Sequence, residues 1–273
     1  MNLSAREFHL IKNLIYDKFG INLGEHKKSL IVQRLHKELR NGGFSSFEDY
    51  YHYVTRDASG QALHVLGDLI STNHTYFFRE EAHFDFLRKC ALPQLDAALR
   101  GRGEKELRIW CAGCSSGEEP YSLSMMLSDY AADNSPGIEF YILGTDIASP
   151  ALQKAAAGVY SSEQISQIPP LYRLHYLENL FDGRWRVKQS IRKRVLFRRL
   201  NLMRREYPFK KCFQVIFCRN VMIYFDAFTR ERLAERFSRC LEPEGYLFIG
   251  HSETLDRSSG LYRFVQPAVY QKI

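Results

Sequence analysis

The feature that most constrains this chain is an alternation of short apolar runs and helical patterns that begins after Gly103. The apolar runs have the length of strands and end in turns, whereas the intervening segments repeat apolar residues at helical spacing. The expected strands are 107–111, 138–143, 213–218 and 245–249, the expected helices are 121–130, 150–157 and 228–241, and a terminal antiparallel pair is expected at 262–265 and 269–272. This alternation predicts a doubly wound α/β domain whose central strands are parallel.

The first 90 residues have a different pattern, in which apolar residues recur at helical spacing and no strand-like alternation interrupts them. Ser4-x-x-Glu7 is a capping box before the first helix, and Gly20 is a stop signal after it. Further helices are expected over 26–41, from 45 onward, and over 63–70. We therefore expect a small all-α domain at 1–72, a linker at 73–105 that contributes to the functional site, and the sheet domain at 106–273.

One segment interrupts the alternation within the sheet domain. From about Leu174 to Phe197 the chain reads as two strands around Asp182-Gly183. Asp-Gly between two extended segments is a hairpin signal. The sequence therefore predicts a small antiparallel β insertion at about 174–197.

Positive charge is concentrated in and after this insertion. Residues 184–211 contain twelve Lys or Arg and one acid, Glu206, so the stretch carries +11, whereas the whole chain carries +7. Such a field attracts an acidic partner. Nucleic acid, anionic lipid and an acidic protein surface all fit the charge, and composition does not choose among them.

Composition excludes several classes of protein. Hydrophobic residues make up 45% and charged residues 25%, which is typical of globular domains and argues against disorder. No apolar run approaches the roughly 18 residues of a membrane-spanning helix. The polar start, Met1–Glu7, does not resemble a secretory signal. We therefore expect a cytoplasmic protein without membrane insertion.

The six cysteines are too sparse for a disulfide scaffold. Cys111 and Cys114 form the one closely spaced pair, for which a redox pair or half of a zinc site is the alternative. No second CxxC or HxxxH accompanies them in the sequence. We therefore expect free thiols packed as small apolar groups and no bound metal.

The first expected strand runs into a glycine-containing turn, Ala112–Pro120. Gly113 and Gly117 let the backbone pass close to a ligand at the end of the strand, where open α/β sheets bind nucleotides. The turn lacks the third glycine of the dinucleotide fingerprint and the Gly-Lys-Ser/Thr of a P-loop. Glu118 and Glu119 also make the helix start unfavourable for phosphate. A nucleoside without phosphates fits better, and a connection that binds no ligand is the alternative.

Polar residues end the next two strands as well. Asp146 follows the second strand, where an acid commonly binds ribose hydroxyls, although usually closer to the glycines. Its alternative role is to cap the helix at Pro150, which Ser149 could do instead. The third strand ends in the polar segment Cys218–Asp226, which faces the same crevice.

Five long motifs follow one another along the chain. They are Asn73-x-Thr75-x-Phe77-Phe78-Arg79, Gly113-x-x-x-Gly117-Glu118-Glu119-Pro120-Tyr121-Ser122, Gly144-Thr145-Asp146, Cys218-Arg219-Asn220-Val221-Met222-Ile223-Tyr224-Phe225 and Gly250-His251-Ser252-Glu253. In type and order they resemble the CheR family, the chemotaxis receptor methyltransferases. The resemblance covers nearly the whole chain. It implies a Rossmann-like class I methyltransferase fold, S-adenosylmethionine as cofactor, S-adenosylhomocysteine as product and receptor glutamates as methyl acceptors.

The resemblance also implies roles for individual residues. Arg79 would pair with the carboxylate of the cofactor, and Arg79 and Tyr224 are the expected catalytic residues. The other expected cofactor contacts are Asn73 and Thr75 at the methionine end, Gly113 and Glu118 at the turn, Asp146 at the ribose, Asn201 and Leu202 at the adenine, and Arg219 and Asn220 on the methyl-transfer side. His251 is tempting as a base, but a structural role is favoured.

The expected chemistry needs no general base. A glutamate side chain has an unperturbed pKa near 4.3, so it is already a nucleophile at neutral pH. Its methylation is an in-line displacement at a sulfonium methyl. The protein must supply alignment and remove water from the carboxylate.

The receptor would be the expected protein partner. Arg34, Lys37 and Arg40 lie on the polar face of the second expected helix and suit docking against acidic receptor helices, although a merely solvated face is the alternative. The resemblance also implies a tethering peptide, which some relatives grip with the hairpin. That use stays open here, although the tight turn and its basic flanks argue against it. We expect a monomer.

The sequence leaves two rival functions to consider. A nucleic-acid methyltransferase would usually carry Asn/Asp-Pro-Pro-Tyr/Phe where this chain has Cys218–Val221, so no nucleic-acid partner is expected. A non-catalytic adaptor that senses the cofactor is the second rival. The filled cofactor positions of the family pattern argue against it.

Overall fold

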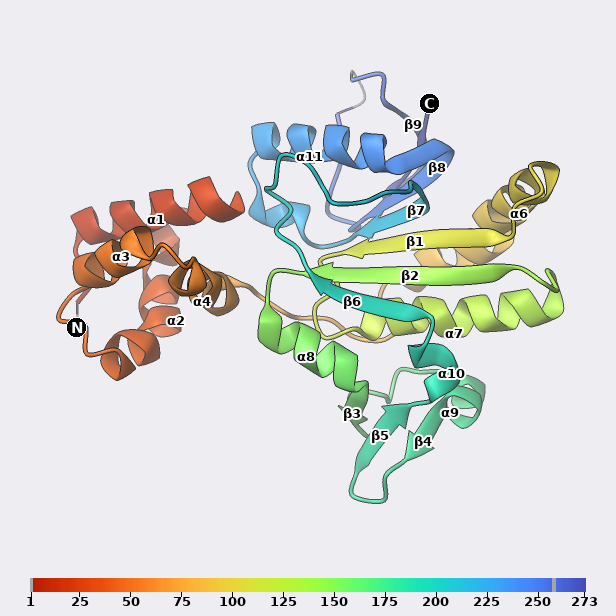
Figure 1. Ribbon diagram of the computed structural model, residues 1–273, viewed down its shortest axis with the longest axis horizontal. Helices are drawn as coiled ribbons and strands as arrows, with labels where there is room; N and C mark the ends of the chain where they lie inside the picture. The colour runs from red at the N-terminus through yellow and green to blue at the C-terminus, as the bar shows by residue number, and fades with distance from the viewer. Residues whose placement is uncertain (1, 257–258) are drawn as a thin grey trace.

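The structure is a computed structural model that describes residues 2–256 and 259–273, and its largest element is a seven-stranded sheet (Figure 1). The strand order is β6-β2-β1-β7-β8-β10-β9. The strands are β1 Glu106–Ala112, β2 Glu139–Asp146, β6 Val195–Arg199, β7 Phe213–Cys218, β8 Leu241–Ile249, β9 Tyr262–Gln266 and β10 Val269–Lys272. The first five in the order are parallel, whereas β10 and β9 are antiparallel to their neighbours. The predicted doubly wound sheet and terminal pair are confirmed.

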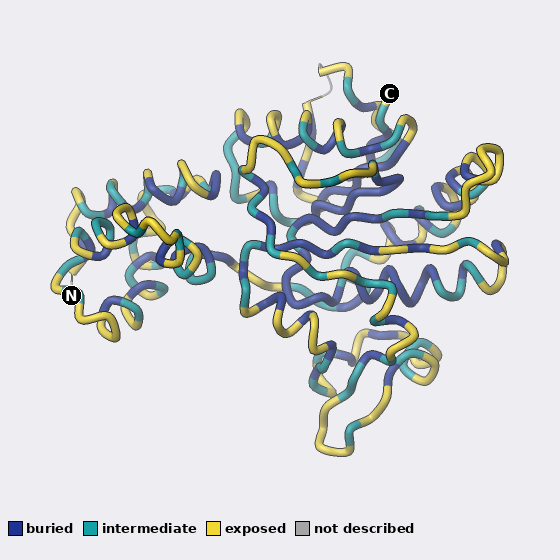
Figure 2. The backbone as a smooth tube through the Cα atoms, viewed as in Figure 1, coloured by how far each residue is buried: buried dark blue, intermediate teal, exposed yellow. Residues whose placement is uncertain are grey.

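Helices cover both faces of this sheet because successive strand residues point to opposite sides. In β1, Ile109 belongs to one core with apolar residues of α5, η2, α6 and α7, whereas the adjacent Trp110 packs edge-on against Phe237 of α11 on the other face. These helices are α5 Glu81–Phe86, the π-helical turn η2 Leu87–Ala91, α6 Leu92–Gly101, α7 Glu118–Asp133 and α11 Ala227–Cys240. A further helix, α8 Ser149–Ala157, packs against β2 and β6. Figure 2 shows the buried backbone concentrated in the strands of the sheet.

A small three-stranded antiparallel sheet projects from the sheet domain in the order β3-β5-β4 (Figure 1). Its elements are β3 Val159–Ser161, α9 Pro170–Tyr176, β4 Leu177–Asn179, β5 Arg184–Val187 and α10 Gln189–Arg192. The predicted hairpin is the pair β4–β5. The expected range of 174–197 differs at both ends. It begins inside α9 and ends inside β6, whose Val195 pairs with Ile142 of the main sheet.

The N-terminal residues form the predicted all-α domain. Its elements are α1 Ala5–Phe19, η1 Glu25–Lys27, α2 Lys28–Asn41, α3 Phe47–Arg56 and α4 Gln61–Ile70. The capping box of Ser4 and Glu7 is present, and Gly20 ends α1 with a φ of +71°. Residues 71–80 then run without helix or strand to the sheet domain. The rest of the expected linker, 81–101, forms α5, η2 and α6 and packs on the sheet.

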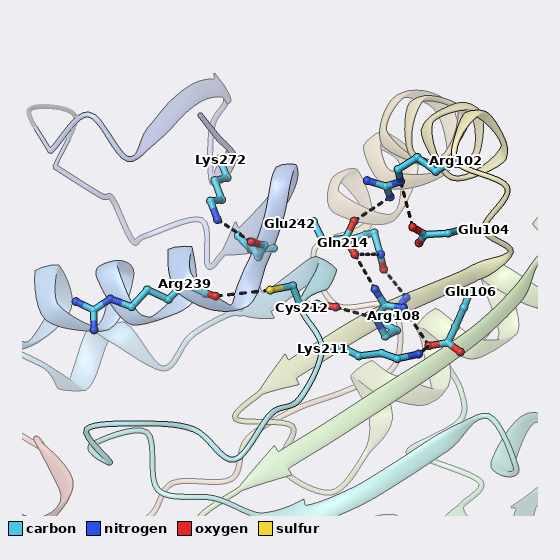
Figure 3. Close-up of polar contacts among 11 residues, drawn as sticks. Arg102, Glu104, Glu106, Arg108, Lys211, Cys212, Gln214, Arg239, Glu242 and Lys272 are labelled. Carbon is cyan, nitrogen blue, oxygen red and sulfur yellow. Dashed lines mark hydrogen bonds and ion pairs between the residues drawn. The ribbon is translucent and has the colours of Figure 1, made fainter.

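The amino ends of the strands are held by an ion-pair cluster (Figure 3). Glu242 of β8 lies 2.6 Å from Arg108 and 2.9 Å from Arg102, and it accepts a 2.7 Å hydrogen bond from Gln214. Because ligands of open α/β sheets bind at the opposite, carboxyl ends of the strands, this cluster is structural. In the described part of the chain, no helix has the length and apolar character needed to cross a bilayer.

Candidate functional site

The strand order reverses between β1 and β7, and this point lies beneath a cleft of about 670 Å³. Such a reversal opens a crevice at the carboxyl ends of the strands. The segments after β1, β2, β6 and β7 line one side of the cleft, and residues of α1, η1 and α2 line the other together with 70–76 and Arg79. The cleft therefore lies between the helical domain and the sheet domain.

The turn after β1 is folded back against β2. Gly113 has a φ of +90°, and a Cβ there would lie 2.4 Å from Cγ2 of Val221. The N–H groups of Gly113 and Cys114 both donate to the Thr145 carbonyl, at 2.8 and 2.9 Å. Only glycine fits the first position, and its backbone faces the cleft, as expected for a close approach to a ligand.

Asp146 lines the cleft at the end of β2, and its carboxylate also holds the surrounding backbone. One oxygen accepts the Ser115 N–H at 2.7 Å and the other the Ala148 N–H at 2.9 Å. Burial raises the pKa of Asp146. Ser149 is not the helix cap: α8 begins at Ser149, whose N–H donates to Asp68 of α4 at 2.9 Å. Asp146 thus joins the glycine turn to β2, and each oxygen keeps acceptor capacity toward the cleft.

The structure places Glu119, not the expected Glu118, on the wall of the cleft. These residues open α7, and successive helical side chains point about 100° apart. Glu118 therefore turns away from the cleft and accepts a 2.7 Å hydrogen bond from Ser116 Oγ, and burial raises its pKa. Glu119 turns toward β7, where it pairs with Arg219. Glu118 thus lies outside the lining of the cleft, and its contact with a cofactor stays a prediction.

Arg219 is the centre of a buried ionic network at the end of β7. Its side chain is 1% exposed and lies 3.2 Å from both Glu80 and Glu119. It also donates to the carbonyl of Arg79. Burial opposes ionisation of Glu80, but Arg219 and the amide of Asn220 outweigh burial and lower the pKa of Glu80. The Arg219 charge is thus shared between two carboxylates, and its guanidinium ties residues 79–80 to the sheet domain.

The expected methionine-end residues lie on the connection between the domains. Asn73, Thr75 and Arg79 all line the cleft. The Arg79 guanidinium donates to the His74 carbonyl at 3.1 Å and lies 5.5 Å from the centre of the Tyr76 ring. No carboxylate pairs with Arg79 among the ion pairs of the described residues, so its charge is available to an anion in the cleft.

Three side chains next to this network are close enough to suggest a metal site. Potential ligand atoms of Glu80, His83 and His251 lie within 4.8 Å of one another. Burial, aided by the Arg219 charge, lowers the pKa of His83 to about 3, so His83 is neutral. However, the Glu80 oxygen that faces the histidines is the one that Arg219 contacts at 3.2 Å. We therefore assign these residues to the ionic network and do not propose a metal site here.

Asn201 and Leu202 follow β6 and line the cleft, as expected. The Asn201 side chain is already engaged, because its Nδ2 donates to the Lys18 carbonyl at 2.7 Å and its Oδ1 accepts the Met203 N–H at 2.9 Å. It therefore joins α1 to the sheet domain. This segment would therefore contact a ligand through its backbone and through Leu202.

The loop after β7 brings Asn220 and Tyr224 to the cleft. Tyr224 is half-buried, and its carbonyl accepts the Asn22 N–H of the helical domain at 2.8 Å. A second contact joins the domains nearby, where the Tyr16 hydroxyl donates to Asp226 at 2.7 Å. Tyr224 therefore lies where the two domains meet over the cleft.

The three basic residues expected as a docking face are separated by the structure. Arg34 turns back from α2 and donates to the carbonyls of Leu69, at 3.1 Å, and Ser71 and to the Thr72 hydroxyl, at 3.2 Å. It also lines the cleft. Its charge satisfies carbonyls at the end of α4, so it does not belong to an exposed face. Lys37 and Arg40 are exposed on α2.

Sequence reasoning missed Glu80 and Glu119 as members of the site. Glu119 could have been found from the helical phase of α7, because its neighbour Glu118 shares a face with Tyr121 and Ser122. Glu80 left no such signal. It adopts a positive φ of +58° just before α5, and its partners are 139 and 140 residues away in sequence.

Comparison with known proteins identifies both domains. Residues 73–270 match the family described as CheR methyltransferase, SAM binding domain, and residues 6–71 match CheR methyltransferase, all-alpha domain. The chain is 44% identical over 272 residues to a chemotaxis protein methyltransferase of Borreliella burgdorferi, covering 100% of this chain and 96% of the relative. It is 38% identical to chemotaxis protein methyltransferase 2 of Pseudomonas aeruginosa, covering 98% and 93%. It is 35% identical to the Escherichia coli chemotaxis protein methyltransferase, covering 98% and 91%.

These matches together span nearly all of the described residues and agree with the architecture seen here. The sheet domain has the class I methyltransferase fold. The chain belongs to the CheR family of S-adenosylmethionine-dependent chemotaxis protein methyltransferases.

Proposed function

We propose that this protein transfers the methyl group of S-adenosylmethionine to glutamate side chains of chemotaxis receptors in the cytoplasm. The products are glutamate methyl esters and S-adenosylhomocysteine. The observation that carries the proposal is the convergence of the connection between the domains, the glycine turn and the loop after β7 on one cleft. Relatives named chemotaxis protein methyltransferases support the same reaction.

The residues of the cleft fit this cofactor. Arg79 offers a positive charge to the carboxylate of the methionine end. Glu119 and Asp146 make the glycine turn unfavourable for a phosphate but acceptable for ammonium and ribose groups. Leu202 and the backbone of Asn201 offer a largely apolar wall to the adenine. Bound in this way, the cofactor supplies an electrophilic methyl group on a sulfonium.

The protein's own part in the reaction is to bind, orient and dehydrate. An acceptor glutamate is ionised at neutral pH and needs no base. Lys27 and Arg34 on the helical side of the cleft favour the approach of a carboxylate. Tyr224, which lines the cleft, would orient that carboxylate through its hydroxyl, and the helical domain would shield the reacting groups from water.

The test uses methyl-labelled S-adenosylmethionine and a receptor fragment that contains the methylation helices. We expect label on the fragment with its glutamates intact and at least about tenfold less label on a fragment in which those glutamates are glutamine, because an amide is not a nucleophile at neutral pH. RNA is the control acceptor. Label on RNA, or equal label on both fragments, would contradict the proposal.

A second prediction concerns docking. Replacing Lys37 and Arg40 together by Glu should slow receptor methylation about fivefold at low salt and leave cofactor affinity unchanged, because exposed charges steer an acidic partner. The difference should shrink in high salt, which screens exposed charges.

The matched control for docking reverses Lys89 and Lys105, two exposed residues away from α2. This control variant should methylate receptors at the wild-type rate. Equal slowing by both double variants would show a general effect of net charge and remove α2 as the docking face.

A further inference from the structure

The loop after β7 contains a residue in the left-handed backbone region. Asn220 has a φ of +60°, a region that residues other than glycine rarely adopt. The loop nevertheless carries Asn220 and Tyr224 to the cleft. Such strained positions persist only when the surrounding structure fixes them.

Glu253, beyond the end of β8, contacts the backbone of this loop at Asn220 and Ile223. Its side chain is buried, with the residue 2% exposed. One carboxylate oxygen accepts the N–H groups of Asn220 at 3.1 Å and Gly250 at 2.6 Å, and the other accepts the N–H group of Ile223 at 3.0 Å. The carboxylate thus joins two points of the loop to the turn after β8.

The chemistry of these contacts requires a carboxylate. All three partners are donors, and an ionised carboxylate is acceptor-only at both oxygens. An amide of the same shape would direct an NH₂ group at one or more backbone N–H groups. The contacts also require a small neighbour. A Cβ on Gly250 would lie 2.8 Å from Asn220 N and 3.0 Å from the Glu253 oxygen.

We propose that Glu253 is a positioning residue for methyl transfer: through backbone N–H groups, it holds the loop that sets Tyr224 beside the acceptor carboxylate. The proposal rests on the proposed function, which places Tyr224 on the methyl-transfer side. Glu253 itself does not line the cleft. Its loss should therefore act on the reaction through the position of the loop.

The experiment compares Glu253→Gln and Gly250→Ala with wild type. The first variant removes the carboxylate, and the second separates the loop from Glu253 without changing charge. In both we expect kcat per cofactor-binding site to fall about tenfold, because small misplacement of reacting groups is costly, while the Kd for S-adenosylhomocysteine stays within about threefold. Hydrogen exchange of the Asn220 and Ile223 amides should become faster.

Glu242→Gln is the matched control, because Glu242 is a largely buried carboxylate at the opposite end of β8 (Figure 3). It should lower the Tm while leaving kcat per binding site and exchange at Asn220 unchanged. Wild-type turnover is measured first on the receptor fragment, so failure of the proposed function is seen separately. If the wild type is active but Glu253→Gln has the wild-type kcat per site and the wild-type amide exchange, the positioning role is wrong. The same conclusion follows from an equal loss of kcat per site in Glu242→Gln.

Discussion

Arg79→Ala is expected to weaken binding of S-adenosylhomocysteine by about 100-fold. The Arg79 guanidinium lines the cleft and is held by the His74 carbonyl at 3.1 Å, so it is already oriented before a ligand arrives. Truncating one partner of a desolvated charge pair costs about 2–5 kcal/mol, and 2.8 kcal/mol corresponds to 100-fold. Isothermal titration calorimetry measures the change directly.

The control for this measurement is Arg88→Ala. Arg88 is a partly exposed arginine of η2 that pairs with Asp133 at 3.4 Å and does not line the cleft. Its replacement should leave affinity for S-adenosylhomocysteine unchanged, and Arg79→Lys should bind with intermediate affinity, because it keeps the charge but loses the bidentate geometry. Wild-type affinity in Arg79→Ala would remove Arg79 from the cofactor site.

Arg219→Met is expected to lower the Tm by about 10 °C at pH 8. Removing one partner from a buried ionic network costs about 3–5 kcal/mol, and in a chain of this size each kcal/mol shifts the Tm by roughly 2–4 °C. The variant leaves Glu80 and Glu119 without their shared cation. Scanning calorimetry measures the loss of Tm. The control is Arg108→Met, which removes an arginine from the ion-pair cluster of Figure 3, where the side chains are more exposed than Arg219.

The loss in Arg219→Met should depend on pH. Burial already raises the pKa of Glu119, which should rise further without Arg219. The pKa of Glu80, which Arg219 lowers in wild type, should rise as well. A carboxyl whose pKa is higher in the folded than in the unfolded state destabilises the fold as pH rises and ceases to do so once it is protonated. The Tm difference from wild type should therefore shrink between pH 8 and about pH 5.5. A constant difference would mean that lost packing, not lost charge, destabilises the variant.

The fold was predictable because its signals are local. Alternating apolar runs predict the strands, and the order of elements predicts the parallel sheet. The edge strand β6 shows where this reasoning is weakest. It lies directly after the basic insertion, and its pairing with β2, from Val195–Ile142 to Arg199–Asp146, assigns it to the main sheet. A contact over such a sequence distance cannot be read from periodicity.

The candidate site was predictable to within about one helical turn. The ends of parallel strands necessarily meet, so Asp146 and Asn220 could be placed at one cleft from strand order alone. The sequence could not predict which of the first residues of α7 faces the cleft, and the structure shows that it is Glu119 rather than Glu118. Arg34 shows a second limit: a charged residue on a polar helix face looked free, but the carbonyls at the end of α4 bind it.

The most direct test of the account is the chemical nature of the methylated product. Receptor fragments are labelled with methyl-labelled S-adenosylmethionine, isolated and treated with alkali, and the volatile label is measured. Carboxyl methyl esters hydrolyse under these conditions, so the account predicts release of nearly all the label as methanol. Label that stays on the receptor after alkali would mean methylation at another atom and would contradict glutamate as the acceptor.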